Sequence, residues 1–202
     1  MMPSDEEIIR QVQRGDRERF GELHLRHYPR VRRYVSRFVF DEEEAMDLAL
    51  EVFVRAYRSV DSYETQERVT YLAYLLRIAQ NLVTDYRRRL PPSQLAPVDE
   101  FEPEAPAARR SFGEELAAWQ TRRRVQWAMS QVSKEDQQVL TLAYVEELSR
   151  QEIAHVLGKP SVTAVTTQLY RATRRVRALL EEPKASAGRE EQQASESQGR
   201  LR

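Results

Sequence analysis

The chain has 202 residues, and its 32 lysines and arginines balance its 32 aspartates and glutamates, so the formal net charge is zero. Six glycines are too few for a glycine-rich nucleotide loop, and the absence of cysteine excludes disulfides, thiolate metal sites and a cysteine nucleophile. No stretch approaches the roughly 20 apolar residues of a membrane helix, and the acidic start MMPSDEEIIR is unlike a signal peptide, so we expect a cytoplasmic protein.

Three segments of the first half have apolar residues at helical spacing. The first covers about residues 16–39, where Pro29 is expected to start a new helix or kink an existing one. The second covers residues 41–60, and acidic side chains in its first turn complement the helix dipole. The third covers about residues 69–90. No segment alternates apolar and polar residues with the two-residue period of a β-strand. The sequence therefore predicts an all-α fold.

A proline-rich and acidic segment follows the third helix. Residues 91–113 include PPSQLAPVDEFEPEAPAARR, which holds five of the nine prolines and cannot build a core. We therefore predict a linker here, between one helical domain at residues 1–90 and another at 114–182. The polar tail, residues 183–202, is predicted to be disordered.

The second half contains a helix–turn–helix pattern. After a helix from about residue 114, Ser149 and Glu152 form a capping box that opens a short helix, and Gly158 fits the left-handed position at its end. A longer helix is predicted from Thr163 to about residue 182. A short capped helix, a turn and a longer helix are typical of DNA-binding proteins.

The open face of that last helix carries the predicted contacts to duplex DNA. Hydroxyl and amide groups near its start suit base edges in the major groove, and the arginines that follow suit phosphates. The alternative is a helical hairpin with a solvated basic face. The expected contact residues are Ser161, Thr163, Thr166, Thr167, Gln168, Tyr170, Arg171, Arg174 and Arg175.

The third helix of the first half carries a second basic face. Its polar positions, placed opposite the apolar stripe, are Arg77, Gln80, Asn81, Thr84 and Arg88. Tyrosines beside a basic surface can stack on unpaired bases. Tyr71 and Tyr74 are spaced equally well for core packing, so Tyr63, in the preceding loop DSYETQERV, is the better candidate.

The second helix has an acidic face formed by Glu43, Glu44, Asp47 and Glu51 with Arg55, which is either solvated or docks a basic protein. No nucleophile–base pair or phosphate loop is indicated, so we do not expect an enzyme. His24 and His27 lie one helical turn apart without a third ligand, and we expect no metal and no cofactor.

Together the two halves resemble regions two and four of the extracytoplasmic-function (ECF) sigma factors of bacteria. The first half matches in DRERFGELHLRHYPRVRRYV, EEAMDLALEVFVRAY and TYLAYLLRIAQNLVTDYRRR. The second half matches in SKEDQQVLTLAYVEELSRQEIAHVLG and VTTQLYRATRRVRALL. The resemblance covers roughly residues 16–90 and 114–181, in the order of the family.

This resemblance implies three surfaces. One would dock on the clamp helices of the largest polymerase subunit, through Glu44, Asp47, Leu50, Glu51, Phe53, Val54 and Arg55. A second would capture an unpaired base at the downstream promoter box, through Tyr63, Glu64, Tyr71, Tyr74, Arg77, Gln80, Asn81, Thr84 and Arg88. The third, the recognition helix, would bind the duplex of the upstream box.

The resemblance also implies partners: core RNA polymerase, through its clamp helices and flap, and double- and single-stranded promoter DNA. It implies an anti-sigma factor as well, which can hold such a protein at the inner membrane. The acidic linker would thread the polymerase active-site channel. No small-molecule substrate is expected.

Two other functions remain open. One is a dimeric helix–turn–helix regulator that acts without polymerase. The other is a polymerase-binding decoy without promoter specificity, which the neutral Thr166 and Gln168 keep open, since the family is often basic there.

Overall fold

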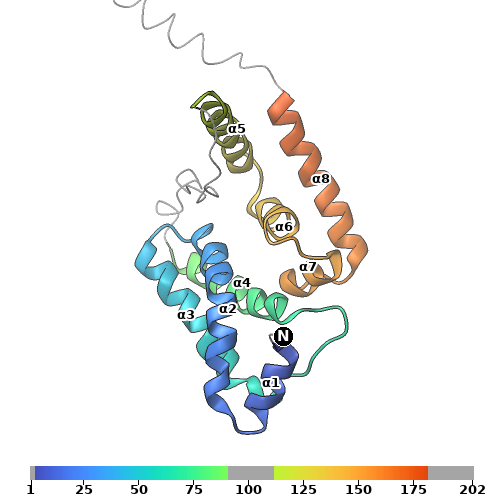
Figure 1. The fold of residues 1–202 in the computed structure, drawn as a ribbon. Helices are drawn as coiled ribbons and strands as arrows, with labels where there is room; N and C mark the ends of the chain where they lie inside the picture. Colours follow the sequence, from blue (N-terminus) through green and yellow to red (C-terminus); the bar gives the residue numbers. More distant parts are fainter. Residues whose placement is uncertain (1–2, 91–111, 182–202) are drawn as a thin grey trace, which may run out of the picture.

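The computed structural model describes residues 3–90 and 112–181, and within these ranges it contains helices and short connections but no β-strand. Figure 1 shows an N-terminal module built from α1–α4 and a C-terminal module built from α5–α8, with α4 and α7 where they meet. This confirms the predicted all-α fold of two helical modules. The predicted linker, apart from its last two residues, and the predicted tail lie outside the described ranges. No helix in these ranges is long and apolar enough to cross a membrane.

The N-terminal module packs its helices around one apolar core. Its elements are α1 (Asp5–Gln13), η1 (Arg17–Arg19), α2 (Phe20–Ser36), α3 (Glu42–Arg58), η2 (Val60–Ser62) and α4 (Tyr71–Arg89). Side-chain caps fix where the later helices start: Asp41 accepts from the Glu44 N–H at 3.0 Å and Thr70 from the Ala73 N–H at 3.3 Å. The predicted helices at 41–60 and 69–90 are therefore present with slightly tighter limits.

Of the two outcomes expected at Pro29, the start of a new helix is wrong, because Pro29 lies inside one continuous helix, α2. Proline removes the N–H that would bond the Leu25 carbonyl. Pro29 and Leu25 are both exposed, so water can reach the carbonyl that is left without this partner.

Helix α1 was not predicted. Ile8, Ile9 and Val12 are buried against the rest of the module. Its last residue, Gln13, donates from Nε2 to the carbonyl oxygens of Val60 at 2.8 Å and Tyr63 at 2.9 Å. A helix of nine residues is marginal alone, so these tertiary contacts decide its formation.

A buried polar chain crosses the core between α2 and α4. The hydroxyl of Tyr34 donates to Oε1 of Gln80 at 2.6 Å, and Nε2 of Gln80 donates to the Thr84 hydroxyl at 3.1 Å. Tyr34 is fully buried, and this burial raises the pKa of its hydroxyl above the ordinary value. The hydroxyl therefore stays protonated and acts as a donor.

The C-terminal module consists of α5 (Phe112–Ser130), α6 (Lys134–Tyr144), α7 (Arg150–Leu157) and α8 (Val162–Glu181). The capping box of Ser149 and Glu152 is confirmed, as is the left-handed conformation of Gly158, whose φ is 61°. Ile153, Val156, Val165 and Ala172 are buried between α7 and its neighbours. The helix–turn–helix geometry predicted from the sequence is thus formed by α7 and α8.

The two modules touch. Helix α7 packs against α4, and the buried apolar residues of both modules belong to one continuous cluster. Polar contacts add to it: the Thr70 hydroxyl donates to Glu152 at 2.6 Å, and Arg30 donates from Nη2 to the Glu146 carbonyl at 2.6 Å.

Candidate nucleic-acid and polymerase interfaces

The start of α8 presents an open polar surface. Ser161 precedes the helix and accepts from the Ala164 N–H at 3.1 Å, which caps the first turn. A shallow depression beside it is lined by residues of the predicted set, including Thr163, Thr167 and Arg171, which are all exposed. At the start of a helix, backbone N–H groups without an intrahelical partner can bind phosphate, and side-chain hydroxyls can bind base edges.

The exposed arginines along α8 differ in their side-chain contacts. Arg171 and Arg174 are exposed, and the Arg174 guanidinium lies 5.9 Å from the centre of the exposed Tyr170 ring. Arg175 is also exposed and lines the same depression, where it pairs with Asp136, whose side chain is only 5% exposed. Its contact with DNA stays a prediction.

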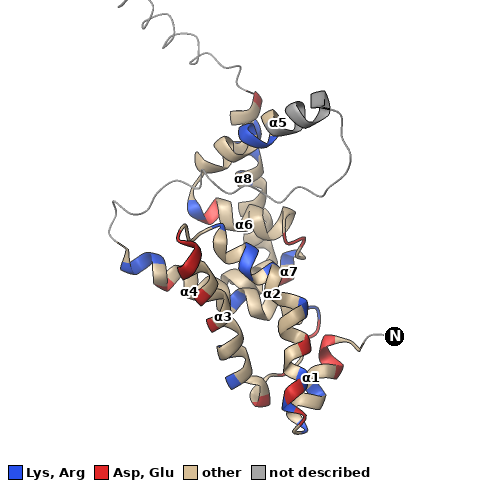
Figure 2. Ribbon diagram, turned by 60° about the vertical axis from the view of Figure 1, so that its left-hand side comes forward, with Lys and Arg blue, Asp and Glu red and all other residues tan. Residues whose placement is uncertain are grey.

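Helix α4 presents a second basic face. Arg77, Asn81, Thr84 and Arg88 are exposed along one line of the helix, as their spacing predicted. The last turn of α4 contains Arg87, Arg88 and Arg89, and Figure 2 shows the ribbon at this end of the helix in the blue of lysine and arginine. Gln80 does not belong to this face, because it is only 8% exposed and its side chain links Tyr34 to Thr84 by hydrogen bonds. Its predicted exposure is wrong.

The three predicted tyrosines form one cluster. Tyr63 lies edge-on to Tyr71, with ring centres 5.4 Å apart, and 4.7 Å from Tyr74. Tyr71 is buried and is therefore not a surface residue, whereas Tyr74 and Tyr63 are half-buried. Burial raises the pKa of the Tyr63 hydroxyl to about 12, with a smaller effect from Glu6. Tyr63 is thus held by packing at the end of η2, next to the exposed Glu64.

The outer face of α3 combines charge with exposed apolar side chains. Leu50 and Val54 are 46% and 41% exposed, and Tyr57 one turn further on is 42% exposed. Acids surround them: Glu44 and Asp47 are exposed, and Glu51 accepts from Nε of Arg55 at 2.8 Å. An exposed apolar strip with a charged border is typical of a surface that binds another protein.

Phe53 is not part of that outer face. It is 4% exposed, and its ring lies edge-on to His24 with ring centres 4.7 Å apart. The prediction that Phe53 docks a partner is therefore wrong, since it packs α3 onto α2. Tyr57, exposed near Leu50 and Val54, was not among the predicted docking residues.

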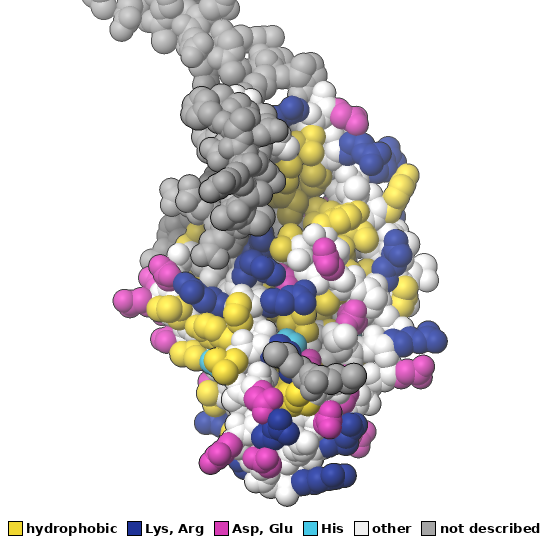
Figure 3. Space-filling model, in the orientation of Figure 1, with side chains coloured by type: hydrophobic (Ala, Val, Ile, Leu, Met, Phe, Trp, Pro, Cys, Tyr) yellow, Lys and Arg dark blue, Asp and Glu magenta, His cyan; other side chains and the backbone are white. Residues whose placement is uncertain are grey.

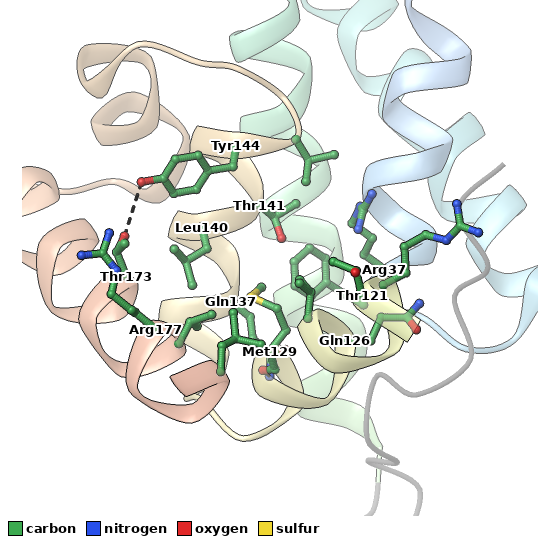
Figure 4. Close-up of a pocket in the computed structure, with 16 residues that line it drawn as sticks. Arg37, Thr121, Gln126, Met129, Gln137, Leu140, Thr141, Tyr144, Thr173 and Arg177 are labelled. Carbon is green, nitrogen blue, oxygen red and sulfur yellow. Dashed lines mark hydrogen bonds between the residues drawn. The ribbon is translucent and has the colours of Figure 1, made fainter. Parts of the chain in front are cut away.

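An apolar groove in the C-terminal module was also not predicted. It encloses about 600 Å³ between α5, α6 and α8, and the end of α2 reaches it with Arg37 and Phe38 (Figure 4). Met129, Leu140 and Tyr144 point into it, and the Tyr144 hydroxyl lies 3.4 Å from that of Thr173. Figure 3 shows yellow apolar side chains in a hollow on this side of the molecule. Tyr144 on its wall is 63% exposed, and no local pattern in the sequence indicated this groove.

The histidine pair has structural contacts. His27 lies with Nε2 2.7 Å from Oδ2 of Asp5, and this pair joins α1 to α2. Burial raises the pKa of Asp5, but hydrogen bonds from His27 and Arg26 outweigh it and the net pKa is lowered. Within residues 3–90 and 112–181 no three side chains come together as metal ligands.

A helix–turn–helix with a basic recognition helix, joined to a second basic helical module, defines a DNA-binding protein of two parts. The sigma-70 region 2 model matches residues 23–90, and the sigma-70 region 4 model matches residues 122–176. These matches fall on the two modules in chain order and together cover more than half of the chain.

Similar proteins agree with this. The RNA polymerase sigma-H factor of Pseudomonas aeruginosa is 29% identical over 83% of this chain and 89% of its own length. The ECF RNA polymerase sigma factor BldN of Streptomyces coelicolor is 31% identical over 86% of this chain and 65% of its own. The structure of CnrH in complex with the cytosolic domain of CnrY has a TM-score of 0.61 and 25% identity, covering 86% of this chain and 95% of that one.

The chain belongs to the extracytoplasmic-function sigma factors, with regions two and four in its two modules. Members of this class bind core RNA polymerase and promoter DNA in order to initiate transcription.

Proposed function

We propose that this sigma factor divides its task among four surfaces, and that it has no catalytic activity of its own. The observation that carries the proposal is the presence, in one chain, of an exposed polar recognition helix and a second basic helix on a separate module. The domains we assign are residues 1–90 and 114–182, with a linker at 91–113 and a tail at 183–202.

The recognition helix α8 is assigned to the upstream promoter box. Thr163, Thr166 and Thr167 are exposed at its start and would lie in the major groove, and Arg171 and Arg174 would hold phosphates. Neutral residues at Thr166 and Gln168 favour base contacts by hydroxyl and amide groups. Gln168 also donates from Nε2 to the Glu135 carbonyl at 3.1 Å, a contact that base recognition would have to replace.

Helix α4 and the loop before it are assigned to the opened downstream box. Arg77, Asn81 and Arg88 would follow the non-template strand, and Tyr63 would stack on an unpaired base. Taking a base out of the stack costs a few kcal/mol, which these contacts must offset. Tyr63→Ala should impair promoter opening more than closed-complex binding, and normal permanganate reactivity of the opened DNA would contradict the stacking role.

Two surfaces are assigned to core polymerase. The strip of Leu50, Val54 and Tyr57, with its acidic border, fits the clamp helices, and the apolar groove with Tyr144 on its wall fits a helix of the flap. Because it would work on chromosomal DNA with polymerase, we place the protein in the cytoplasm. The solved complex of CnrH with the cytosolic domain of CnrY supports a protein partner here too, of the anti-sigma kind.

In vitro transcription tests the proposal against the two alternatives. Core polymerase reconstituted with this chain should select specific promoter fragments from a genomic pool and initiate on them, whereas core polymerase alone should not. A stand-alone regulator would bind a palindrome without core enzyme, as a dimer by light scattering. A decoy would co-elute with core enzyme and initiate nowhere. Absence of co-elution would refute the sigma function for this chain.

A further inference from the structure

Helix α1 is tied to the start of the loop that carries the predicted base-stacking tyrosine. This loop, which we call the downstream-box loop, comprises residues 63–70 and runs from η2, beside which α1 packs, to the start of α4. Nε2 of Gln13 donates to the carbonyl oxygen of Val60 at 2.8 Å and to that of Tyr63 at 2.9 Å. The sigma-70 region 2 model matches from residue 23 onwards, so Gln13 lies outside the part of the chain that it covers.

The two carbonyls bound by Gln13 mark the beginning and the end of one tight turn. The Val60 carbonyl closes the turn by accepting from the Tyr63 N–H at 3.2 Å, and Tyr63 leaves it in an extended conformation, with φ −70° and ψ 124°. The nitrogen of a primary amide carries two N–H donors, so one side chain can bind both carbonyls at once. Gln13 therefore fixes the turn and also the direction in which the loop leaves it.

Packing holds the ring of Tyr63, whereas Gln13 holds its backbone. The ring lies against Tyr71 and Tyr74, but residues 64–68 are all exposed, so burial restrains them little. A second tie joins Nη2 of Arg17 to both carboxylate oxygens of Asp61 at 2.8 Å. These two side chains are 40% and 62% exposed, and ion pairs of this kind contribute little. The partly buried amide of Gln13 is thus the stronger restraint at this end of the loop.

We propose that Gln13 is a positioning residue for promoter opening, whose amide sets the conformation of the downstream-box loop before DNA arrives. This rests on the proposed assignment of Tyr63 to an unpaired base. Gln13 would not contact DNA itself and would act through the backbone of Tyr63. A loop that is fixed beforehand loses less conformational freedom when it binds, which raises its affinity for the opened strand. Helix α1 is then part of the device that opens the promoter.

The test variant is Gln13→Met, which keeps the length of the side chain and removes both donors. The matched control, Gln11→Met, makes the same change two residues earlier on the same helix, where Oε1 accepts from Nη1 of Arg19 and not from the loop. Urea unfolding and co-elution with core polymerase verify that each variant is folded and forms holoenzyme. Gln13→Asn is the second variant, because it keeps the amide but shortens its reach, and it should cause a loss in the same direction.

Binding of reconstituted holoenzyme is measured with two probes from a promoter that the parent holoenzyme selects: the single non-template strand of the downstream box and the duplex of the upstream box. One net hydrogen bond shifts a conformational equilibrium about fivefold, so loss of two lowers the population of the competent loop by at most about 25-fold. We expect Gln13→Met to weaken single-strand binding about tenfold. Duplex binding by this variant, and binding of both probes by Gln11→Met, should stay within about twofold of the parent.

A double variant shows whether Gln13 acts through Tyr63. Tyr63→Ala should itself weaken single-strand binding, and adding Gln13→Met to it should change the affinity by less than about twofold. A merely structural role would instead give the same further loss in both backgrounds, and that result, or full single-strand affinity of Gln13→Met, would overturn the role of Gln13 and leave the sigma function intact. Normal strand binding by Tyr63→Ala would refute the stacking assignment and the role of Gln13 together.

Discussion

The buried hydrogen bond between Tyr34 and Gln80 gives a quantitative prediction about the N-terminal module. Tyr34→Phe keeps the ring and removes the hydroxyl, which donates to Gln80 at 2.6 Å. The net value of such a bond is about 1 kcal/mol, and the Gln80 oxygen left without a partner adds a desolvation penalty, so we expect the free energy of unfolding to fall by about 2 kcal/mol.

Urea unfolding followed by far-ultraviolet circular dichroism measures this loss. With an m value of about 2 kcal/mol/M, the midpoint should fall by about 1 M at unchanged m. Both tryptophans lie in α5, so fluorescence reports the C-terminal module and should move less than the dichroism signal. The control is Tyr144→Phe, whose hydroxyl lies 3.4 Å from that of Thr173 on the surface, and it should change stability by less than about 0.5 kcal/mol.

A double variant separates the hydrogen bond from packing. Tyr34→Phe with Gln80→Met replaces both polar partners by apolar groups of similar shape, so no buried oxygen is left unpaired, and it should recover at least half of the lost stability. If the double variant were less stable than the single one, or if Tyr34→Phe had no measurable effect, the buried polar chain would not have the stabilising role that its geometry indicates.

Three further predictions concern the C-terminal module. Arg171→Ala should weaken upstream-box binding and lower the slope of log affinity against log salt by about 1, measured by fluorescence anisotropy at several salt concentrations; an unchanged slope would exclude a phosphate contact. Gly158→Ala should cost about 1 kcal/mol in urea unfolding, because alanine is strained at a φ of 61° although the space around it is open. Burial, together with Arg77, lowers the pKa of His155 from 6.5, so the folded chain favours the neutral ring, and stability should be full above pH 6.5 and fall as the pH drops below it. His155→Gln should flatten that part of the pH profile.

The helices with strong periodicity were predictable because their apolar stripes and caps are local features. The capping box at Ser149 and the left-handed Gly158 are examples, since each depends on residues three or four positions apart. Helix α1 was not predictable in this way. Its apolar residues are few, and its contacts come from Val60 and Tyr63, some 50 residues away in the chain.

The site predictions differ for a similar reason. Periodicity places a residue on a helix face, but it does not say which faces another element will cover. Gln80 was assigned to an outer face by its spacing, and Phe53 to a docking surface by the family resemblance, whereas neighbouring helices bury both. The pairing of Arg175 with Asp136 from α6 was likewise not visible in the spacing of α8. The groove is formed by four helices together, so no single stretch of sequence contains its signal.

The net charge of zero can be interpreted once the positions of the charged residues in the structure are known. Sequence-independent attraction to DNA grows with the number of phosphates that a protein neutralises, so a uniformly basic chain would spend most of its time on non-specific sites. Here Arg87, Arg88 and Arg89 lie in the last turn of α4 and Arg171 and Arg174 are exposed on α8, whereas Glu42, Glu43 and Glu44 lie in the first turn of α3. On the proposed assignment, each basic face contributes part of the promoter affinity, and both faces bind one promoter at once. A partner that fixes the spacing of the two faces raises promoter affinity without adding a single contact to the DNA, because it converts the second binding step into an intramolecular one.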